Sequence, residues 1–448
     1  MTELAVHPTV KRFQSRQPGE ASAAAPVLLD SAGLRQLALE AGADDAGLVE
    51  IDRPEIADQK SDILAVFPHA RTLLSFVRRM NRENLRSAAR SIANLEFHMT
   101  IDEVDAIARR IVAALEERGV RAINGGAGGF PMEASRWPGK IWVISHKPVA
   151  VAAGLGRMGI HRNVIHPQFG NHILLGTVVM DAVVTSYSKP IDYNPCLECK
   201  LCVAACPTGA IGPDGHFNFA ACYTHNYREF MGGFTDWVER IAGSRNAREY
   251  RSKVDDAETV SMWQSLSFGP NYKAAYCLAV CPAGEDVIGP FLKDRRQYLQ
   301  DVVRPLQEKE ETIYVTAGSD AEAYVRRRYP HKRTKRVGNG FRPASIGQFL
   351  AGLSLSFQRQ QADGLNATYH FTFTGAEELK ATVVIRNKTL EVRAGHAGKA
   401  GLRVTADSRT WLRFLAGEQR LVWALIRHKI RITGSPRLMA AFARCFPR

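Results

Sequence analysis

The sequence predicts a mixed fold with an α/β (α+β) N-terminal domain, a loop-rich cysteine domain and a C-terminal α+β domain. Helix-like and strand-like segments alternate up to about residue 190, seven of the eight cysteines crowd into residues 196–281, and the last hundred residues alternate polar and apolar side chains. A length of 448 residues suits two or three domains. We expect a disordered leader, the α/β domain, the cysteine domain, a charged basic linker and the last domain at residues 1–28, 29–190, 191–300, 301–344 and 345–448.

The N-terminal part carries clear local signals. The leader is rich in Pro, Ala, Ser and Gln and lacks the apolar core of a secretion signal, which is typical of disorder. Leu34 and Leu37 recur at helical spacing before Gly42 stops the run. In order, we expect helix, turn and strand over 30–52, a helix over 101–118, and strands over 140–145 and 172–181.

The positive charge is concentrated in two stretches. The formal net charge is +14, and residues 326–336 carry seven Lys or Arg with no acid, while residues 403–448 carry ten with two acids. Such a basic linker and tail can meet anionic lipid, nucleic acid or an acidic protein, and the alternative is a solvated linker without a partner. No apolar run of about 18 residues exists, so we expect a cytoplasmic protein that meets an anionic membrane surface only at its periphery.

The cysteines carry the most specific signal. The stretch "CLECKLCVAACP" has the spacing C-x2-C-x2-C-x3-C-P, from Cys196 to Pro207. Three thiolates at this spacing wrap one iron–sulfur cluster, and the fourth cysteine swings away to a second cluster. A structural zinc site is the alternative, but zinc sites favour paired C-x2-C units separated by a longer loop. The spacing therefore favours iron and sulfide.

A second motif, "NYKAAYCLAVCPAG", ends in C-x3-C-P but has Ala274 where a further cysteine is usual. Counting ligands, the first cluster takes Cys196, Cys199, Cys202 and Cys281, and the second takes Cys206, Cys222 and Cys277 with one corner vacant. His225 could fill that corner, the second cluster could hold three irons, or Cys445 could reach back. For Cys445, a small buried core residue is the favoured interpretation.

At this point the chain resembles a known group. "AAGLGRMGIHRNVIHPQFGNHILLG" followed by "NPCLECKLCVAACPTGAI" is similar to epoxyqueuosine reductases and corrinoid-dependent reductive dehalogenases, over about residues 30–295. The resemblance implies a corrinoid-binding α/β domain and a ferredoxin-like domain with two [4Fe–4S] clusters, here with the second atypical. It also implies bound cobalamin, faced by Gly154, Gly156, Gly159, Asn163, Phe169 and Gly170.

The glycine spacing also fits G-x-G-x-x-G, a dinucleotide-binding pattern. That pattern needs a strand directly before the first glycine, and the preceding "HKPVAVAA" reads as helix. The remaining alternative is a tight turn in which glycine supplies a positive φ.

The chain departs from the resembled reductases at their proposed general acid. Ser145 stands at that position and His146 follows it, while the family's "DYH" segment appears as "EFH", Glu96 to His98. Histidine can donate a proton near neutral pH, so His146 and Glu96 are the candidate proton donors, with a satisfied loop histidine as the alternative for His146. The family's helical repeats that contact transfer RNA are absent from the sequence, so no transfer RNA partner is expected.

Residues 345–448 resemble a sterol carrier protein domain through "LNATYHFTFTG", "LRVTADSRTWLRFLAG" and "IRHKIRITGSPRLMAAFARCFP". The resemblance implies an apolar, lipid-like ligand. The alternative is that the apolar residues simply fill a core.

Three functions follow. The first is an iron–sulfur oxidoreductase that takes electrons from a ferredoxin or flavodoxin-type donor and passes them to a substrate or corrinoid in the N-terminal domain. The second is a non-catalytic electron-transfer protein tethered to lipid or to a partner enzyme. The third is a lipid-binding protein with a vestigial redox core.

Overall fold

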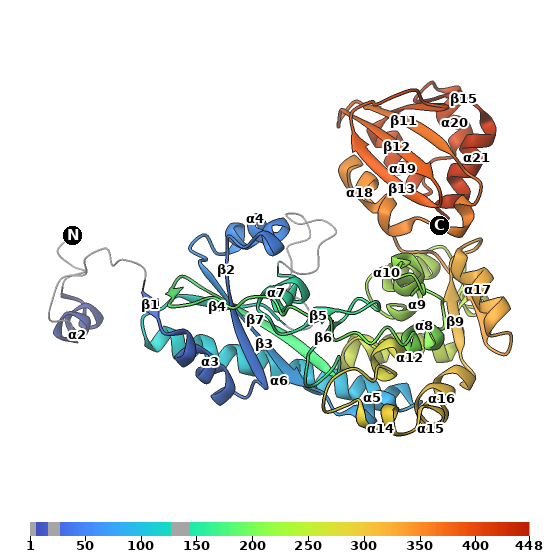
Figure 1. Ribbon diagram of the computed structural model, residues 1–448. Coiled ribbons are helices and arrows are strands. Elements are labelled where there is room, and N and C mark those ends of the chain that lie inside the picture. Colours follow the sequence, from blue (N-terminus) through green and yellow to red (C-terminus); the bar gives the residue numbers. More distant parts are fainter. Residues whose placement is uncertain (1–5, 17–26, 127–143, 448) are drawn as a thin grey trace.

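The computed structural model describes residues 6–16, 27–126 and 144–447. The N-terminal domain is built on a four-stranded antiparallel sheet in the order β2–β3–β7–β4 (Figure 1). Its elements are α2 (Pro8–Arg16), β1 (Leu28–Leu29), α3 (Ser31–Glu40), β2 (Asp45–Glu50), the 3-10 turn η1 (Pro54–Ile56), α4 (Ala57–Val66), β3 (Thr72–Arg79), α5 (Arg82–Arg86), α6 (Arg90–Glu117), β4 (Ala122–Asn124), α7 (His146–Ala152), β5 (Arg157–Met158), β6 (Val164–Ile165), β7 (Ile173–Met180) and β8 (Val183–Val184).

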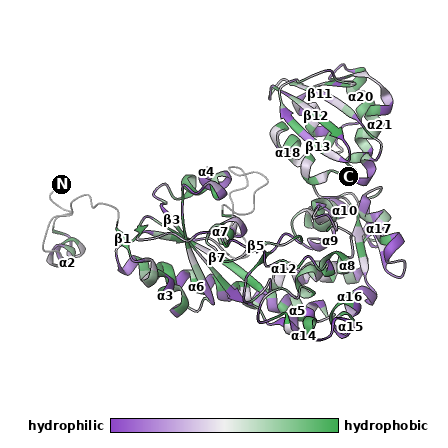
Figure 2. Ribbon diagram, in the orientation of Figure 1, coloured by the Kyte–Doolittle hydropathy of each residue, from purple (hydrophilic) through white to green (hydrophobic). Residues whose placement is uncertain are grey.

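Helices cover both faces of this sheet. On one face, α3 and α6 bury Leu34 and Ile107 against Leu74. On the other, α4 and α7 bury Ile63 and Val149 against the strands. The central strands β3 and β7 are therefore apolar along most of their length, as Figure 2 shows in green.

The structure confirms most of the local expectations. Residues 30–52 form α3 and β2, and β7 occupies the strand expected at 172–181. The helix expected at 101–118 is the second half of α6, which begins at Arg90 because Ala93 and Phe97 in its first turns are also buried. The strand expected at 140–145 falls mainly outside the described residues.

The leader contains a helix rather than disorder alone. Residues Pro8–Arg16 form α2, while residues 1–5 and 17–26 lie outside the described part of the chain. Lys11, Arg12 and Gln14 are good helix formers, and Pro8 occupies the first helical position, where its missing N–H costs nothing.

The cysteine domain is mostly helical. Its elements are α8 (Leu201–Ala205), α9 (Phe219–Asn226), α10 (Gly232–Ala242), α11 (Ala247–Lys253), α12 (Asp256–Phe268), α13 (Tyr276–Ala279), α14 (Gly289–Lys293), α15 (Arg295–Tyr298), the π-helical turn η2 (Leu299–Val303), α16 (Arg304–Glu308), β9 (Thr312–Val315), α17 (Asp320–Arg328) and β10 (Arg333–Arg336).

The segment 301–344, expected as a charged linker, is instead part of this domain. Strands β9 and β10 pair in parallel, and Leu306, Ile313 and Val325 are buried in the same core as Cys202 and Cys206. The segment folds because apolar residues alternate with its charges, and those charges find carboxylate partners, as described below.

The C-terminal domain has a five-stranded sheet in the order β13–β12–β11–β14–β15, in which β11 and β14 run parallel and the other pairs antiparallel. Its elements are α18 (Ile346–Ser356), the 3-10 turn η3 (Gln360–Ala362), β11 (Ala367–Thr374), β12 (Leu379–Arg386), β13 (Thr389–Ala394), β14 (Leu402–Asp407), α19 (Ser408–Leu415), α20 (Leu421–Ile426), β15 (Ile430–Gly434) and α21 (Pro436–Cys445).

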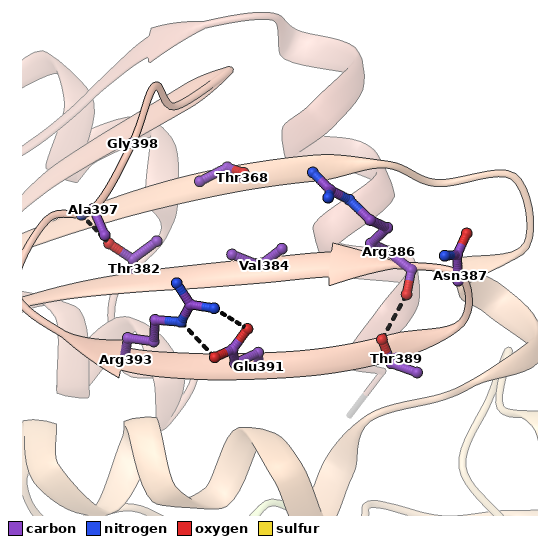
Figure 3. A pocket seen from close by; sticks show the side chains of 10 residues that line it. All are labelled: Thr368, Thr382, Val384, Arg386, Asn387, Thr389, Glu391, Arg393, Ala397 and Gly398. Atoms are coloured by element: carbon purple, nitrogen blue, oxygen red, sulfur yellow. Dashed lines mark hydrogen bonds and ion pairs between the residues drawn. The ribbon is translucent and has the colours of Figure 1, made fainter.

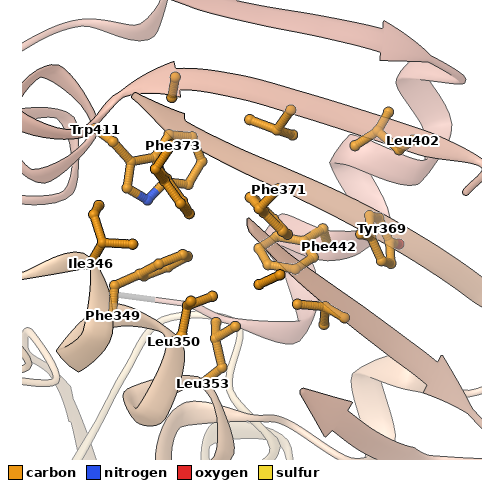
Figure 4. Packing of buried hydrophobic residues seen from close by; sticks show 14 of the residues in the cluster. Ile346, Phe349, Leu350, Leu353, Tyr369, Phe371, Phe373, Leu402, Trp411 and Phe442 are labelled. Atoms are coloured by element: carbon orange, nitrogen blue, oxygen red, sulfur yellow. The ribbon is translucent and has the colours of Figure 1, made fainter. Parts of the chain in front are cut away.

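The two faces of this sheet differ. One face packs an aromatic core against the helices, where Phe349, Phe371 and Trp411 lie ring to ring (Figure 4). The opposite face carries a polar groove along β11–β13, in which Arg393 pairs with Glu391 (Figure 3). The strand alternation seen in the sequence separates these two faces.

The last domain contacts the cysteine domain through residues 358–361, through α18 against α9, and through Pro447, whose carbonyl accepts from the Asn339 side chain. Gln358 receives the backbone N–H of Asp320 at 2.9 Å, and Arg359 forms an ion pair with Asp214. Figure 1 shows the C-terminal domain standing beside α9 and α17, away from α3 and β2. Within the described residues, no helix is both long enough and apolar enough to cross a membrane.

Candidate iron–sulfur sites

The first cysteine motif forms a tight loop that leads into α8. Glu198 and Lys200 adopt left-handed backbone conformations, with φ of 49° and 63°. Such conformations cost non-glycine residues about 1–2 kcal/mol each. They persist where the surroundings hold them, and here they curl the chain between Cys196 and Cys202.

The loop brings four cysteines together. Cys196, Cys199 and Cys202 line one pocket together with Cys281 from the second motif, which lies at the end of α13. The N-terminal domain closes part of this pocket with Ile160 and His161. These four thiols are the set counted from the sequence for the first cluster.

The remaining three cysteines form a second group. Cys206 ends α8, Cys222 lies on α9 and Cys277 on α13, and each of the two helical thiols feels the charge of Cys206. Burial, followed by that charge, raises the pKa of Cys277 to about 11. Ala274 packs against the same core, and its backbone N–H donates to the Asn226 side chain at 2.9 Å.

The donor sets suit iron–sulfur clusters. Both groups are made of thiols alone, which is the ligand type of such clusters. Burial raises the pKa of Cys281 to about 12, so this thiol is neutral when free and cluster binding must displace its proton. Over the described part of the chain, no three His, Cys, Asp or Glu side chains converge on a position for one metal ion.

A buried cation without a carboxylate partner lies beside the second group. Arg90 packs its guanidinium 5.3 Å from the centre of the Tyr276 ring, and Cys277 is among the charges that act on it. Its Nε and Nη2 are buried and have no hydrogen-bond partner among the described residues. Burial lowers the pKa of Arg90. The charge of Glu311 acts on Arg90 without forming an ion pair with it, and an anionic cluster held by Cys277 would add further negative charge.

A second cation reaches this group from the N-terminal domain. Lys147 donates to the Asn163 side chain at 2.9 Å, and the Asn163 amide lies 3.8 Å from the sulfur of Cys277. Lys147 keeps contact with solvent, although the surrounding protein lowers its pKa. Through Asn163, the exposed Lys147 is therefore linked to the second group.

His225, considered as a ligand for the vacant corner, is engaged elsewhere. Its Nδ1 accepts the backbone N–H of Tyr314 on β9 at 3.3 Å, and its ring stacks 6.1 Å from that of Tyr314. Only Nε2, which is buried without a partner in the described structure, is left to ligate. Cys445, the other candidate, is fully buried in the C-terminal core, as expected for a core residue.

The two candidate proton donors are both held by hydrogen bonds. His146 has Nδ1 within 2.9 Å of the Thr177 hydroxyl and donates from Nε2 to the Gly126 carbonyl at 3.1 Å. Burial lowers its pKa, so it is neutral at pH 7. Glu96 is buried, and its carboxylate accepts hydrogen bonds from Asn81, Asn84 and Thr100. Glu96 therefore ties α5 to α6.

The glycine loop contacts its own chain. An added Cβ would lie 2.4 Å from the Lys189 carbonyl at Gly154, 2.3 Å from the Ile165 carbonyl at Gly156, and 2.0 Å from the Ala283 carbonyl at Gly170. At Gly159 the nearest atom is the Ile165 side chain, at 2.7 Å. These close approaches to the chain itself explain why glycine occupies the four positions.

Phe169 and Asn163 also have partners within the chain. Phe169 stacks on His166 with ring centroids 4.6 Å apart, and Arg79 lies over its other side. Of the residues expected to face a corrinoid, Asn163 alone reaches a cysteine. Sequence reasoning missed Lys147 and Arg90, because neither belongs to a motif and their positions depend on packing between distant segments.

Two family models match parts of the chain. A 4Fe-4S binding domain matches residues 189–212, and an alkyl sulfatase C-terminal domain matches residues 341–448. The first match agrees with the cysteine loop described above. The second covers the domain expected to resemble a sterol carrier protein, and that expected likeness is not supported.

By sequence, the chain is similar to epoxyqueuosine reductases. One from Vibrio cholerae is 28% identical over 124 residues, which are 28% of this chain and 32% of the relative. One from Bacillus cereus is 33% identical over 79 residues, which are 18% of this chain and 20% of the relative. The chain thus spans about a third or less of the length of these curated relatives.

Solved structures align weakly. A catabolic reductive dehalogenase covers 61% of this chain and 34% of its own, at 15% identity and a TM-score of 0.37. The epoxyqueuosine reductase of Streptococcus thermophilus covers 61% and 75%, at 14% identity and a TM-score of 0.34. Sterol Carrier Protein 2 from Yarrowia lipolytica covers 22% and 90%, at 10% identity and a TM-score of 0.20. Together, the sequence matches support a 4Fe–4S domain in a chain similar to epoxyqueuosine reductases.

Proposed function

We propose that this protein is an iron–sulfur oxidoreductase with two clusters, which passes electrons to a substrate bound beside Lys147. The observation that supports the proposal is that four cysteines line one pocket, while Cys222 and Cys277 lie within electrostatic reach of Cys206. The Asn163 amide links Cys277 to Lys147. The similarity to epoxyqueuosine reductases supports the redox assignment.

In this proposal the two groups have different tasks. When bound, the clusters supply single electrons at low potential. The first group lies near the surface, where Tyr193 and Leu197 are exposed, and this suits docking of a ferredoxin or flavodoxin-type donor. The second group is linked to the exposed Lys147 through Asn163, so substrate reduction is assigned to it. Leu201 and Tyr276 are buried around the cysteines and keep water away.

Lys147 is the side chain placed to deliver a proton to a reduced substrate. It is solvent-accessible, it borders the second group, and its pKa is lowered by the surrounding protein. A lowered pKa makes an ammonium a better acid at neutral pH. His146 and Glu96, the donors expected from the sequence, are less suited because their polar atoms already have partners.

The proposal is tested by anaerobic purification with iron, sulfide and cobalt counted, followed by EPR of the reduced protein. We expect two cluster signals, and reduction of a substrate that slows in Lys147→Gln while the clusters remain. A single cluster in fully loaded protein would contradict the two-cluster assignment. Intact clusters with no retained cobalt after reconstitution with cobalamin would exclude a corrinoid.

The competing function is electron transfer without catalysis, with the N-terminal domain as a docking scaffold. It is favoured because His146 and Glu96, the expected proton donors, already have hydrogen-bond partners within the chain. Reduction of a small molecule by the purified, cluster-loaded protein alone would reject it. A transfer RNA role is not proposed, because the basic stretch at 326–336 is largely paired within the chain.

We also propose an apolar ligand for the C-terminal domain. The indole N–H of Trp411 is buried among aromatic rings without a hydrogen-bond partner in the described structure. An orphaned donor in an apolar core is costly, and a polar atom of a bound amphiphile would satisfy it. The affinity for a fluorescent fatty acid should be about tenfold lower in Trp411→Phe, which keeps an aromatic ring and removes the N–H donor. Equal binding by both proteins would reject this ligand.

A further inference from the structure

The two basic stretches of this chain differ in how their charges are used. In the first, residues 326–336, Arg326 and Arg336 both pair with Glu322. Lys332 pairs with Glu311, and Lys335 pairs with Glu258. Most of this charge is therefore consumed inside the cysteine domain. The positive charge left over for an external partner lies in the second stretch, in the C-terminal domain.

Helix α20 exposes large apolar side chains on the outside of that domain. Val422, Trp423 and Ile426 are 64%, 53% and 60% exposed, and we call these three residues the α20 tip. Ala424 and its neighbours Leu421 and Leu425 hold the helix to the core. A helix that is apolar on both its buried and its exposed side is unusual for a water-facing surface and marks an interaction site.

Cations surround the α20 tip. Arg420, Arg427 and Lys429 are exposed, and none of them forms an ion pair with another described residue; we call them the basic rim. Of the nearest acids in sequence, Glu418 pairs with Arg413, and Asp407 caps α19 while feeling the charge of Lys429, so Arg420 and Arg427 carry most of the uncompensated charge. Figure 1 shows α20 on the outer side of the C-terminal domain, away from the cysteine domain.

We propose that the α20 tip inserts into the surface of an anionic lipid bilayer while the basic rim contacts the lipid phosphates. A tryptophan with aliphatic neighbours and flanking Arg or Lys is the composition that membrane interfaces favour. Anionic lipid attracts such cations. A second copy of the chain is a poorer occupant, since a symmetric contact would place the basic rim against its own positive charge. This docking does not depend on the redox proposal.

The test uses the full, cluster-loaded chain in flotation with vesicles of phosphatidylcholine alone or of phosphatidylcholine with phosphatidylglycerol. We expect binding only with the anionic lipid. Trp423→Ser should weaken it about tenfold, and Arg420→Gln with Arg427→Gln should weaken it about fivefold for each charge removed. Trp263→Ser is the matched control, because Trp263 on α12 is 56% exposed but has no place in the proposed contact. It should bind as the unmodified chain does.

Brominated lipid provides the second measurement. Quenching of tryptophan fluorescence should occur in the unmodified chain and in Trp263→Ser, and should disappear in Trp423→Phe. Vesicle binding that Trp423→Ser leaves unchanged would overturn the proposal. So would a dimer in sedimentation that the same substitution abolishes, because the tip would then be an interface between copies. Thermal melting of each variant checks that it is folded.

Discussion

Ala274 stands where a fourth thiolate would complete the second cysteine group. It packs against the core that holds Cys206, and Cys222 and Cys277 border the same core. Ala274 thus brings a methyl group, and no thiolate, to the core that the three cysteines share. A cluster held by three thiolates either loses the iron at that corner or binds it with another ligand.

Ala274→Cys should complete the second cluster. We expect iron to rise from about seven to about eight per chain, and a three-iron EPR signal of the oxidised protein to disappear. Ala275→Cys is the matched control, because Ala275 packs against Leu85 and Phe97 on the other side and should leave the signal as it is. An unmodified chain that already holds eight irons would show that another ligand fills the corner.

Arg90 should raise the reduction potential of the second cluster. A buried cation stabilises the more negative, reduced state, so Arg90→Gln should lower the potential by roughly 50–100 mV, as for a unit charge about 7–10 Å away at an effective dielectric constant of about 20. Arg90→Lys keeps the charge and should restore most of the shift. The measurement is an EPR-monitored redox titration. If Arg90→Gln and Arg90→Lys shift the reduction potential equally, packing of the arginine side chain is the cause, and its charge is not.

His172 should make stability depend on pH. Burial, with the charges of Arg86 and Arg82 nearby, lowers its pKa from 6.5 to about 3. The unfolded chain therefore binds a proton that the folded chain refuses as the pH falls from 6.5 toward 3, and stability declines over that window, by about 2 kcal/mol at pH 5. Urea unfolding at pH 7 and pH 5 should show a smaller loss in His172→Gln. An equal loss would assign the pH dependence to other groups.

At the scale of elements, the loop that contains Gly170 joins the two domains. Gly170 has a φ of 67° and approaches the carbonyl of Ala283, two residues beyond Cys281. His166 and Gly170 bond to each other through their backbones, and the Glu285 N–H donates to the Pro167 carbonyl. The N-terminal domain thus supports the loop that carries the last ligand of the first group.

Gly170→Ala should therefore destabilise the protein and deplete the first cluster. A methyl group there meets the Ala283 carbonyl at 2.0 Å, in addition to the left-handed strain of about 1–2 kcal/mol. Gly119→Ala is the control that carries the backbone strain alone. Gly119 has a φ of 74°, but an added methyl group there would meet only open space. Thermal melting should fall in both variants, and iron content only in Gly170→Ala. Full iron content in Gly170→Ala would mean that the loop adapts.

Local structure at this scale was largely predictable. Periodicity placed α3, β2 and β7, because a helical or strand spacing of apolar residues is visible in one short window. It did not predict that 301–344 would fold, since that depends on Lys332 and Lys335 meeting acids 21 and 77 residues away. Charge composition alone cannot distinguish a paired cation from a solvated one.

At the scale of the whole molecule, two cores differ in what holds them together. The cysteine domain buries Cys202 and Cys206 within its own core, so cluster binding and folding are coupled there. The C-terminal domain has a separate apolar core whose one cysteine, Cys445, has no place in either group. The two cores are joined by polar contacts of Gln358 and Arg359, by α18 against α9, and by the Asn339–Pro447 hydrogen bond.

Anaerobic iron chelation should consequently act on one part of the chain. We expect calorimetry of the loaded protein to show more than one transition, and chelation to lower the transition of the cysteine domain by several degrees while the C-terminal transition stays in place. Limited proteolysis assigns the surviving fragment, which should begin near residue 341. A common shift of all transitions would contradict the independence of the two cores.

The sequence by itself determined the chemistry of this protein's best-defined feature, because the spacing C-x2-C-x2-C-x3-C-P constrains a short loop regardless of what surrounds it. It also determined the alternation that gives the last sheet one apolar face. Tertiary structure alone decided which side chains border the thiols. Asn163 meets Cys277 across 114 residues, and Arg90 lies beside Tyr276 with no carboxylate partner among the described residues. Such contacts arise from burial and the packing of distant segments, which leave no local spacing to read.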